Sequence, residues 1–346
     1  MPVKSKVNAS FDYLKFVLAI LVVSLHTRFL TGALYPLQRL AVPLFFIMSS
    51  YFFFGKLRAT PDAAQQKAQL KGFCKRNWQL YAFWTVVLLP VVVYTRRGWF
   101  SLSVVRCILT ILRDVFYAGA FTASWFLIAL IIATALIFWG SKKLSNLWLL
   151  GLSFLVYVGA LFFSGFSFLI PEGSALSVGM AWYAEVFVSP CNSFPVALLW
   201  VTMGKCFADG TFDGLAKVAE KGTRWVCGAA VLILLYGEWL FVRHMTDGSG
   251  KDCYLMLVLA APVLFQIVKG ISLEANGVSR FLRQSSIVLF VLHGSVLHVL
   301  RPILRMIGLE YNGLLFVLIS LGCLAATWII LRLENKKGFR WLKYAH

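Results

Sequence analysis

The chain has 346 residues, of which 60% are apolar and 14% charged, and its mean hydropathy is +0.79. One or two soluble cores cannot hide that much apolar surface, so the composition argues against a soluble fold and requires lipid as a solvent. The formal net charge of +19 would favour nucleic-acid binding in a soluble protein. Beside apolar spans, basic residues instead record the orientation of the helices, and no zinc-finger spacing or basic reading helix accompanies the charge. We therefore expect no nucleic-acid partner.

Apolar segments of about 20 residues recur along the chain, each long enough to cross a bilayer as a helix. They predict an all-α polytopic membrane protein with about ten transmembrane helices, forming one domain over residues 1–346 with no soluble part. The expected spans are 11–30, 38–55, 76–95, 124–140, 147–165, 192–207, 223–243, 253–270, 285–304 and 313–333. The stretch 101–118 is also apolar, but it carries two arginines and Asp114 at helical spacing. We expect an amphipathic interfacial or re-entrant helix there.

The distribution of basic residues predicts how these spans are oriented. An even number of spans leaves both termini on one side of the membrane. Most of the lysines and arginines, including those of the loop 56–75, fall on the side that would hold the N-terminus. Because cytoplasmic loops carry an excess of such residues, we expect both termini in the cytoplasm and the 166–191 segment outside.

The seven cysteines are scattered along the chain, with no CxxC pair and no clustering with histidine that would suit a metal ion. We interpret them as free, small apolar residues. Only Cys191 and Cys253 fall near the expected outer surface. A disulfide between these two is the alternative.

The first expected span carries three ionisable side chains on one face. At about 100° per residue, Asp12, Lys15 and His26 lie within about 60° of one another around the helix axis. Lys15 and His26 are about three turns, or about 16 Å, apart, so one stripe holds a cation near the inner end and an imidazole near the outer end. Ionisable groups inside a span cost free energy, so each needs a reason. Snorkelling of Lys15 beside Asp12, and an interfacial His26, are the structural alternatives to a role in proton transfer.

The ninth expected span adds two further histidines. Ser286 and His293 are about two turns apart and share a face, whereas His298 aligns with the arginines at the outer end of the span. We interpret His298 as part of an outer cluster and His293, near mid-membrane, as a candidate functional group. Glu238, in the outer half of the seventh span, is expected to hold an imidazole or to pair with Arg243.

Taken in order, these residues resemble the acyltransferase 3 family of integral membrane proteins, which contains bacterial O-acetyltransferases of surface polysaccharides. In that family the first helix opens with an Asp-Tyr-Leu-Arg-like run and reaches a histidine, and the second reads Pro-Leu-Phe-Phe before a Ser-Gly-Tyr-like turn. A Trp-Phe-Leu step and a Ser…Tyr-Leu-x-His pattern follow. The matching positions are Asp12, Tyr13, Leu14, Lys15 and His26, Pro43 to Phe46, Ser49 to Tyr51, Trp125 to Leu127, and Ser286 with Phe290 to His293. The chain departs from the pattern at Lys15 and Ser50, where Arg and Gly are usual, and at Gln79, where a second basic residue would follow Arg76.

The resemblance implies an enzyme, an acyltransferase of the class that transfers groups other than aminoacyl groups. It would move a short acyl group, usually acetyl from acetyl-CoA, to a hydroxyl of a sugar, an exported glycan or a lipid-linked glycan. His26 is then the proton-transfer residue, which activates the acceptor hydroxyl directly or through an acyl-enzyme step. Lys15 would orient or neutralise charge in the donor channel, and His293 would help to position the acceptor or the thioester. Supporting roles would fall to Asp12, Glu238 and Ser286, and donor-phosphate contacts to Lys75, Arg76, Lys142 and Lys143. The expected partners are lipid, acyl-CoA and a glycan or glycolipid acceptor, with no bound cofactor and no metal. The location that the resemblance implies is the bacterial cytoplasmic (inner) membrane.

Two other functions would also use polar groups inside a membrane. A transporter or flippase for a lipid-linked or acidic metabolite would need intramembrane lysine and histidine, although the chain has no clear internal repeat of the kind seen in many transporters. In a non-catalytic membrane scaffold, the stripe on the first span would be idle. Formation of an acylated product from acyl-CoA separates the enzyme from both.

Overall fold

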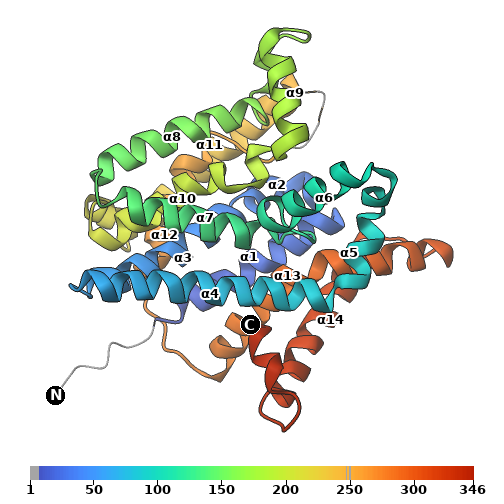
Figure 1. Ribbon diagram of the computed structural model, residues 1–346. Helices are drawn as coiled ribbons and strands as arrows, with labels where there is room; N and C mark the ends of the chain where they lie inside the picture. The colour runs from blue at the N-terminus through green and yellow to red at the C-terminus, as the bar shows by residue number, and fades with distance from the viewer. Residues whose placement is uncertain (1–7, 247, 249–250) are drawn as a thin grey trace.

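The computed structural model describes residues 8–246, 248 and 251–346, and regular structure in these ranges is helical apart from one isolated bridge between Asn8 and Glu274. The α-helices are α1 (Ser10–Thr27), α2 (Thr31–Arg39), α3 (Ala41–Arg58), α4 (Ala63–Val87), α5 (Leu89–Thr95), α6 (Val104–Arg113), α7 (Trp125–Gly140), α8 (Asn146–Phe162), α9 (Ala175–Phe187), α10 (Phe194–Asp209), α11 (Arg224–Met245), α12 (Leu257–Lys269), α13 (Gly277–Met306) and α14 (Asn312–Leu333). Short helical turns are Arg97–Ser101, Asp114–Ala118, Ser167–Leu169, Pro190–Asn192, Asp213–Ala219 and Arg340–Tyr344. Figure 1 shows the long helices gathered in one bundle, with α5 and α6 at one end. The predicted all-α fold is confirmed.

The expected spans fall on helical segments of different lengths, and the span 76–95 is divided between α4 and α5. Among the described residues, six stretches are helical, long and apolar enough to cross a membrane: Ser10–Thr27, Thr31–Arg58, Ala175–Asp209, Arg224–Met245, Gly277–Met306 and Asn312–Leu333. The pair α4 and α5 would make a seventh, bent by 74°. Three shorter apolar helices are Trp125–Gly140, Asn146–Phe162 and Leu257–Lys269. These helices support a multi-pass membrane protein, and the count of ten spans stays a prediction.

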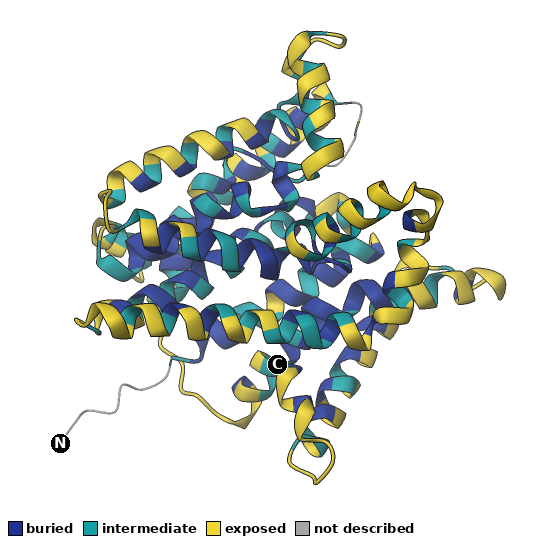
Figure 2. Cartoon of the chain, viewed as in Figure 1, coloured by how far each residue is buried: buried dark blue, intermediate teal, exposed yellow. Residues whose placement is uncertain are grey.

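Large apolar side chains cover the outside of the bundle as well as its core. Leu147 and Trp148 at the start of α8 are 77% and 68% exposed, and Trp225 and Val226 at the start of α11 are exposed to a similar degree. In Figure 2 exposed residues run along the outward sides of the helices and buried residues fill the centre. A soluble protein would not leave so many large apolar groups in water, whereas lipid chains would cover them.

The extensive contact between α3 and α10 in the core depends on small residues. A Cβ added to Gly204 of α10 would lie 2.0 Å from the Oγ of Ser50 and 2.5 Å from the carbonyl oxygen of Ile47. Ser50 is fully buried, and its hydroxyl donates to the Phe46 carbonyl at 2.7 Å. The buried hydroxyl of Ser50 is therefore hydrogen-bonded. The space for its side chain comes from Gly204 on the facing helix, so glycine is not needed at position 50 itself.

The stretch 101–118 forms the amphipathic α6 and the turn that follows it. None of the residues of α6 is buried, and Val104 and Val105 are 75% and 68% exposed, as suits a helix lying at a membrane interface. Asp114 ties this segment down because it is 1% exposed and paired with Arg96 at 3.3 Å and Arg113 at 2.8 Å. Asp114 and Arg113 of this stretch thus form an anchor with Arg96, whereas Arg106 stays exposed.

Candidate active site

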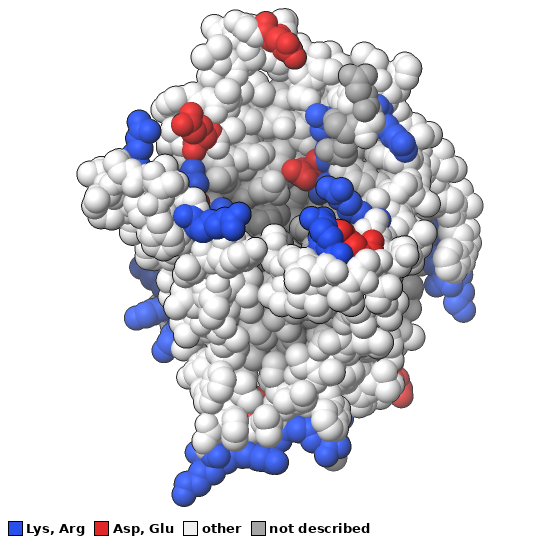
Figure 3. Space-filling model, turned by 90° about the vertical axis from the view of Figure 1, so that its right-hand side faces the viewer, with Lys and Arg blue, Asp and Glu red and all other residues white. Residues whose placement is uncertain are grey.

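A cavity of about 500 Å³ lies where α1 ends, between α1, α2, α7, α10 and α13. Figure 3 looks onto the end of the molecule that carries α5 and α6, and there the surface is hollowed, with basic and acidic side chains around the hollow. Polar lining residues of this outer cavity are His26, Arg28, Gln38, Arg39, Thr122, Asn192, Asp252, His298 and Arg301. Its aromatic lining residues are Trp125, Tyr157, Trp200 and Phe290. Such a mixture of aromatic and hydrogen-bonding groups suits a small organic ligand with polar groups.

His26 of α1 lies against His293 of α13, with ring centroids 4.9 Å apart and planes at 45°. The Nδ1 of His293 is 2.9 Å from the Leu289 carbonyl oxygen, and since a carbonyl can only accept, Nδ1 carries the proton. In the neutral imidazole, Nε2 then keeps its lone pair. This Nε2 is buried and has no hydrogen-bond partner among the described residues. His293 thus offers an acceptor next to the ring of His26, which lines the cavity.

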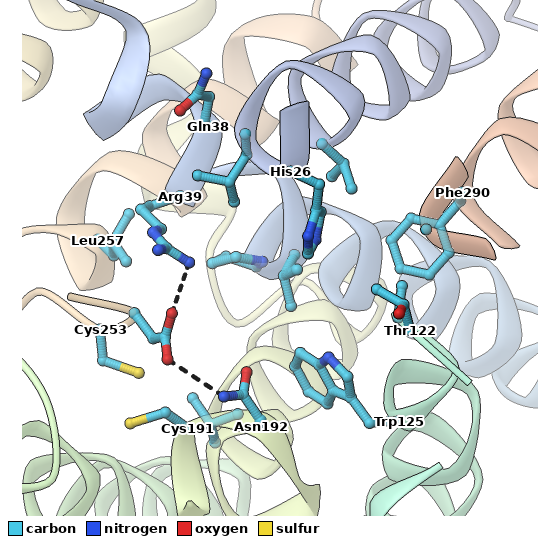
Figure 4. A pocket seen from close by; sticks show the side chains of 18 of the residues that line it. His26, Gln38, Arg39, Thr122, Trp125, Cys191, Asn192, Cys253, Leu257 and Phe290 are labelled. Atoms are coloured by element: carbon cyan, nitrogen blue, oxygen red, sulfur yellow. Dashed lines mark hydrogen bonds and ion pairs between the residues drawn. The ribbon is translucent and has the colours of Figure 1, made fainter. Parts of the chain in front are cut away.

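A chain of polar side chains crosses the opposite wall of the outer cavity. Arg39 of α2 pairs with Asp252 at 2.7 Å, and the amide of Asn192 donates to the other oxygen of Asp252 at 3.2 Å, as the dashed lines in Figure 4 mark. The sequence did not point to these residues, since Asn192 and Asp252 precede α10 and α12 in connecting segments. Only Arg39 could have been predicted as a site residue, because it is a charged residue at the edge of an expected span.

The turn before α7 brings Trp125 into the cavity. Gly119 has a φ of 86°, and a Cβ there would lie 2.3 Å from the Trp125 nitrogen, so this close turn needs a glycine. Ser124 donates its hydroxyl hydrogen bond to the Phe121 carbonyl at 2.6 Å and closes the turn. Thr122 of the same turn lies 3.3 Å from the Nε2 of His298, which links α7 to α13 at the mouth of the cavity.

A second cavity, of about 470 Å³, lies toward the other end of α1. Lys15, Arg76, Arg283 and Lys343 supply four cationic side chains to its wall, and Ser286, Gln284 and Asn77 supply neutral polar groups. A third, adjoining cavity of about 720 Å³ shares Arg76 and adds Lys56. Phe290 lines both the inner and the outer cavity.

The predicted site residues divide between these cavities. Lys15, Arg76 and Ser286 line the inner one and His26 the outer one, so the stripe on α1 connects the two. Lys15 lies 5.4 Å from the centroid of the Phe52 ring and makes no salt bridge with Asp12 in the described structure. Asp12 is buried and lines neither cavity.

Other predicted residues lie elsewhere. Lys75, Lys142 and Lys143 are exposed and line none of the three cavities, and Lys142 lies over the Phe138 ring at 4.7 Å. Glu238 does not hold an imidazole or pair with Arg243. Its carboxylate accepts from the backbone N–H groups of Leu255 and Met256, both at 2.6 Å, because the start of α12 offers unpaired donors.

No group of three or more His, Cys, Asp or Glu side chains is arranged to hold a metal ion within the described ranges. All seven cysteines are free. Cys191 and Cys253 both line the outer cavity, and the Cys191 thiol donates to the Ala160 carbonyl at 3.2 Å instead of forming the alternative disulfide.

Comparison with known proteins gives the family. A family model described as an acyltransferase domain matches residues 8–332. An amino-acid racemase of Enterococcus faecalis is 21% identical over 273 residues, which are 77% of this chain and 36% of that protein. A serine/alanine racemase of Enterococcus gallinarum is 22% identical over 362 residues, 96% of this chain and 47% of that protein, so the chain spans less than half the length of these relatives. No solved structure matches the chain. Because the family model covers nearly the whole helical bundle, the resemblance is confirmed, and the chain belongs to the acyltransferase 3 family.

Proposed function

We propose that this acyltransferase moves a short acyl group, such as acetyl, from acyl-CoA in the inner cavity to a sugar hydroxyl in the outer cavity. One observation carries the proposal: a basic cavity and a histidine-lined cavity share the side chain of Phe290. A thioester and a hydroxyl could meet at that side chain while the bulk of each substrate stays in its own cavity. The inner cavity would face the cytoplasm, where acyl-CoA is made.

The inner cavity suits a polyphosphorylated donor. Lys15, Arg76, Arg283 and Lys343 converge on it from α1, α4, α13 and the C-terminal turn. That turn is fastened to α4, because Trp84 donates its indole N–H to the Ala345 carbonyl at 3.0 Å. Cationic side chains grouped in a cleft attract and hold phosphate oxygens better than isolated surface charges do. Lys75, Lys142 and Lys143 would contribute at most to the field around the entrance.

The outer cavity suits the proton transfer that such a reaction needs. His26 would take the proton of the acceptor hydroxyl as its oxygen attacks the thioester carbonyl carbon. The carbon–sulfur bond then breaks, and the imidazolium returns the proton to the leaving thiolate, so that coenzyme A leaves as the thiol. The lone pair on the Nε2 of His293 would accept a hydrogen bond from His26 and hold its ring in one orientation.

The experiment uses the purified protein in phospholipid vesicles with radiolabelled acetyl-CoA and a cell-surface glycan extract. Wild type should transfer label to the glycan, and His26→Ala should lower that rate by about 10²–10⁴-fold with expression and thermal unfolding unchanged. His244→Ala is the matched control, because His244 is exposed on α11 and lines neither cavity.

Further arms separate the rival functions. Serine is included as a second acceptor because one relative is named for acting on it. A wild-type protein that moves substrate across the vesicle membrane without any acylated product would favour the carrier. A His26→Ala protein within a few-fold of the wild-type rate would remove His26 from the mechanism.

A further inference from the structure

The turn after α1 places an arginine at the outer cavity in an unusual backbone conformation. Arg28 has φ 60° and ψ 26°, and Leu30 has φ 53°, so two non-glycine residues within three positions are left-handed. A helix commonly ends in this conformation, but glycine is the residue that adopts it without a steric cost. Such strain persists only where surrounding contacts enforce it.

A buried polar clamp enforces this turn. The Ser24 hydroxyl donates to the Phe29 carbonyl, and the Gln38 amide donates to the Ser24 hydroxyl at 2.9 Å. Ser24 is 2% exposed and Gln38 1% exposed, so neither hydrogen bond competes with water. The clamp joins α1 to α2 and fixes the backbone of Arg28 two residues after His26.

The outer cavity also carries more positive charge than its acidic groups neutralise. Three arginines line it, and Asp252, its one acidic lining residue in the described structure, is paired with Arg39. Arg28 makes no hydrogen bond or salt bridge through its side chain in the part of the chain that the structure describes. The Nε of Arg301 is buried without a hydrogen bond, 3.6 Å from Glu310. Glu310 is itself already held by two hydrogen bonds from Arg305.

Arginines at this end of the bundle call for an explanation. If the outer cavity faces away from the cytoplasm, the positive-inside tendency disfavours basic residues there. The guanidinium groups of Arg28 and Arg301 both have unused hydrogen-bond donors, and they line the same cavity as His26. Guanidinium groups bind carboxylate or phosphate oxygens, often through two parallel hydrogen bonds.

We propose that the acceptor carries an anionic group, a carboxylate or a phosphate, close to the hydroxyl that is acylated, and that Arg28 and Arg301 bind that group. The part of this proposal that concerns the acylated hydroxyl rests on the proposed function. The anion site itself does not depend on acyl transfer. The rigid turn at Arg28 would set the distance between the anionic group and the hydroxyl presented to His26.

Binding without any acyl donor tests the anion site. The purified protein in phosphatidylcholine nanodiscs, which contain no anionic headgroups, is titrated with glucuronate, glucose 1-phosphate and glucose, and binding is followed by saturation-transfer NMR. At least one anionic sugar should bind about 10-fold or more tighter than glucose, as one or two charge-assisted hydrogen bonds would give. Arg28→Gln should remove that preference and Arg28→Lys should restore part of it. The control Arg97→Gln, exposed and outside both cavities, should leave it intact.

A transfer assay separates failure of this idea from failure of the proposed function. The glycan extract is used untreated, with its carboxyl groups reduced, or with its phosphates removed. Label should disappear after one of the two treatments. Undiminished labelling after both, or equal binding of all three sugars by wild type, overturns the anion site and leaves acyl transfer standing. Anion-selective binding that depends on Arg28, with no label in any arm, overturns acyl transfer and leaves the anion site.

Discussion

The contact between His26 and His293 joins two residues that lie far apart in the sequence. His26 lies on α1 and His293 on α13, and their ring centroids are 4.9 Å apart, so the two side chains are in contact. The Nε2 of His293 is buried without a hydrogen-bond partner among the described residues, and in the proposed mechanism it acts through the neighbouring ring of His26. Removing either residue should therefore disturb the same step of the reaction.

Mutant kinetics can detect this dependence. His293→Gln should lower kcat, while the His26→Ala/His293→Gln double variant should be no slower than His26→Ala alone, because residues that act as a unit are not additive. Rates of acyl transfer by the four proteins, with detergent stability as the control, measure the coupling. A double variant slower by the product of the two single effects would mean that the histidines act independently.

Lys15 differs from the arginine usual in the family, and the inner cavity gives room for either cation. Lys15→Arg should keep substantial activity because it keeps the charge beside the donor, whereas Lys15→Met should raise KM for acyl-CoA and lower activity strongly. KM for the acceptor should stay nearly unchanged. If Lys15→Met acted on the acceptor KM alone, Lys15 would have no place in donor binding.

At the scale of helices, the approach of α3 to α10 is the tightest fit in the core. Gly204→Ala would force a methyl group against the Ser50 hydroxyl and the Ile47 carbonyl, and overpacking of this kind costs about 1–3 kcal/mol. The control is Gly72→Ala in α4, where a Cβ meets nothing within 4 Å and the change should stabilise the helix by up to about 1 kcal/mol. Thermal unfolding in detergent should rank Gly204→Ala below wild type and Gly72→Ala at or above it. The reverse order would contradict the packing argument.

Helices were the part of the fold that the sequence could predict, because length and hydropathy are local properties. The sequence could also predict that Lys15 and His26 share one face, since both lie on the same helix and helical periodicity is regular. Contacts between distant segments were not, which is why the pairing of Arg39 with Asp252 and the role of Glu238 at the start of α12 were missed. The prediction that Lys142 and Lys143 contact donor phosphates rests on their charge alone, and charge does not tell which loop borders a cavity.

For the whole molecule, the orientation in the membrane is the prediction on which the donor and acceptor sides depend. In a cysteine-free background, a cysteine placed at Gln65 in the 56–75 loop should resist an impermeant thiol reagent in intact cells. A cysteine at Leu176 in the 166–191 segment, which is 58% exposed, should react. Lysed cells control for accessibility at both positions. Labelling of the cysteine at position 65 in intact cells would show that the predicted orientation is wrong, and the donor and acceptor sides would then be exchanged.

Phe290 has a consequence for the cell that is separate from catalysis. If the two cavities open to opposite faces of the bilayer, as the proposed orientation requires, and both hold water, the ring of Phe290 that lines both would be the barrier to proton leakage between them. Phe290→Ala should make vesicles leak protons, measured with an enclosed pH-sensitive dye, while Phe241→Ala on the exposed side of α11 should not. In the proposed reaction the acyl group would pass this ring while protons are held back, so the size of the side chain at position 290 would bear on both the acyl group and the proton gradient.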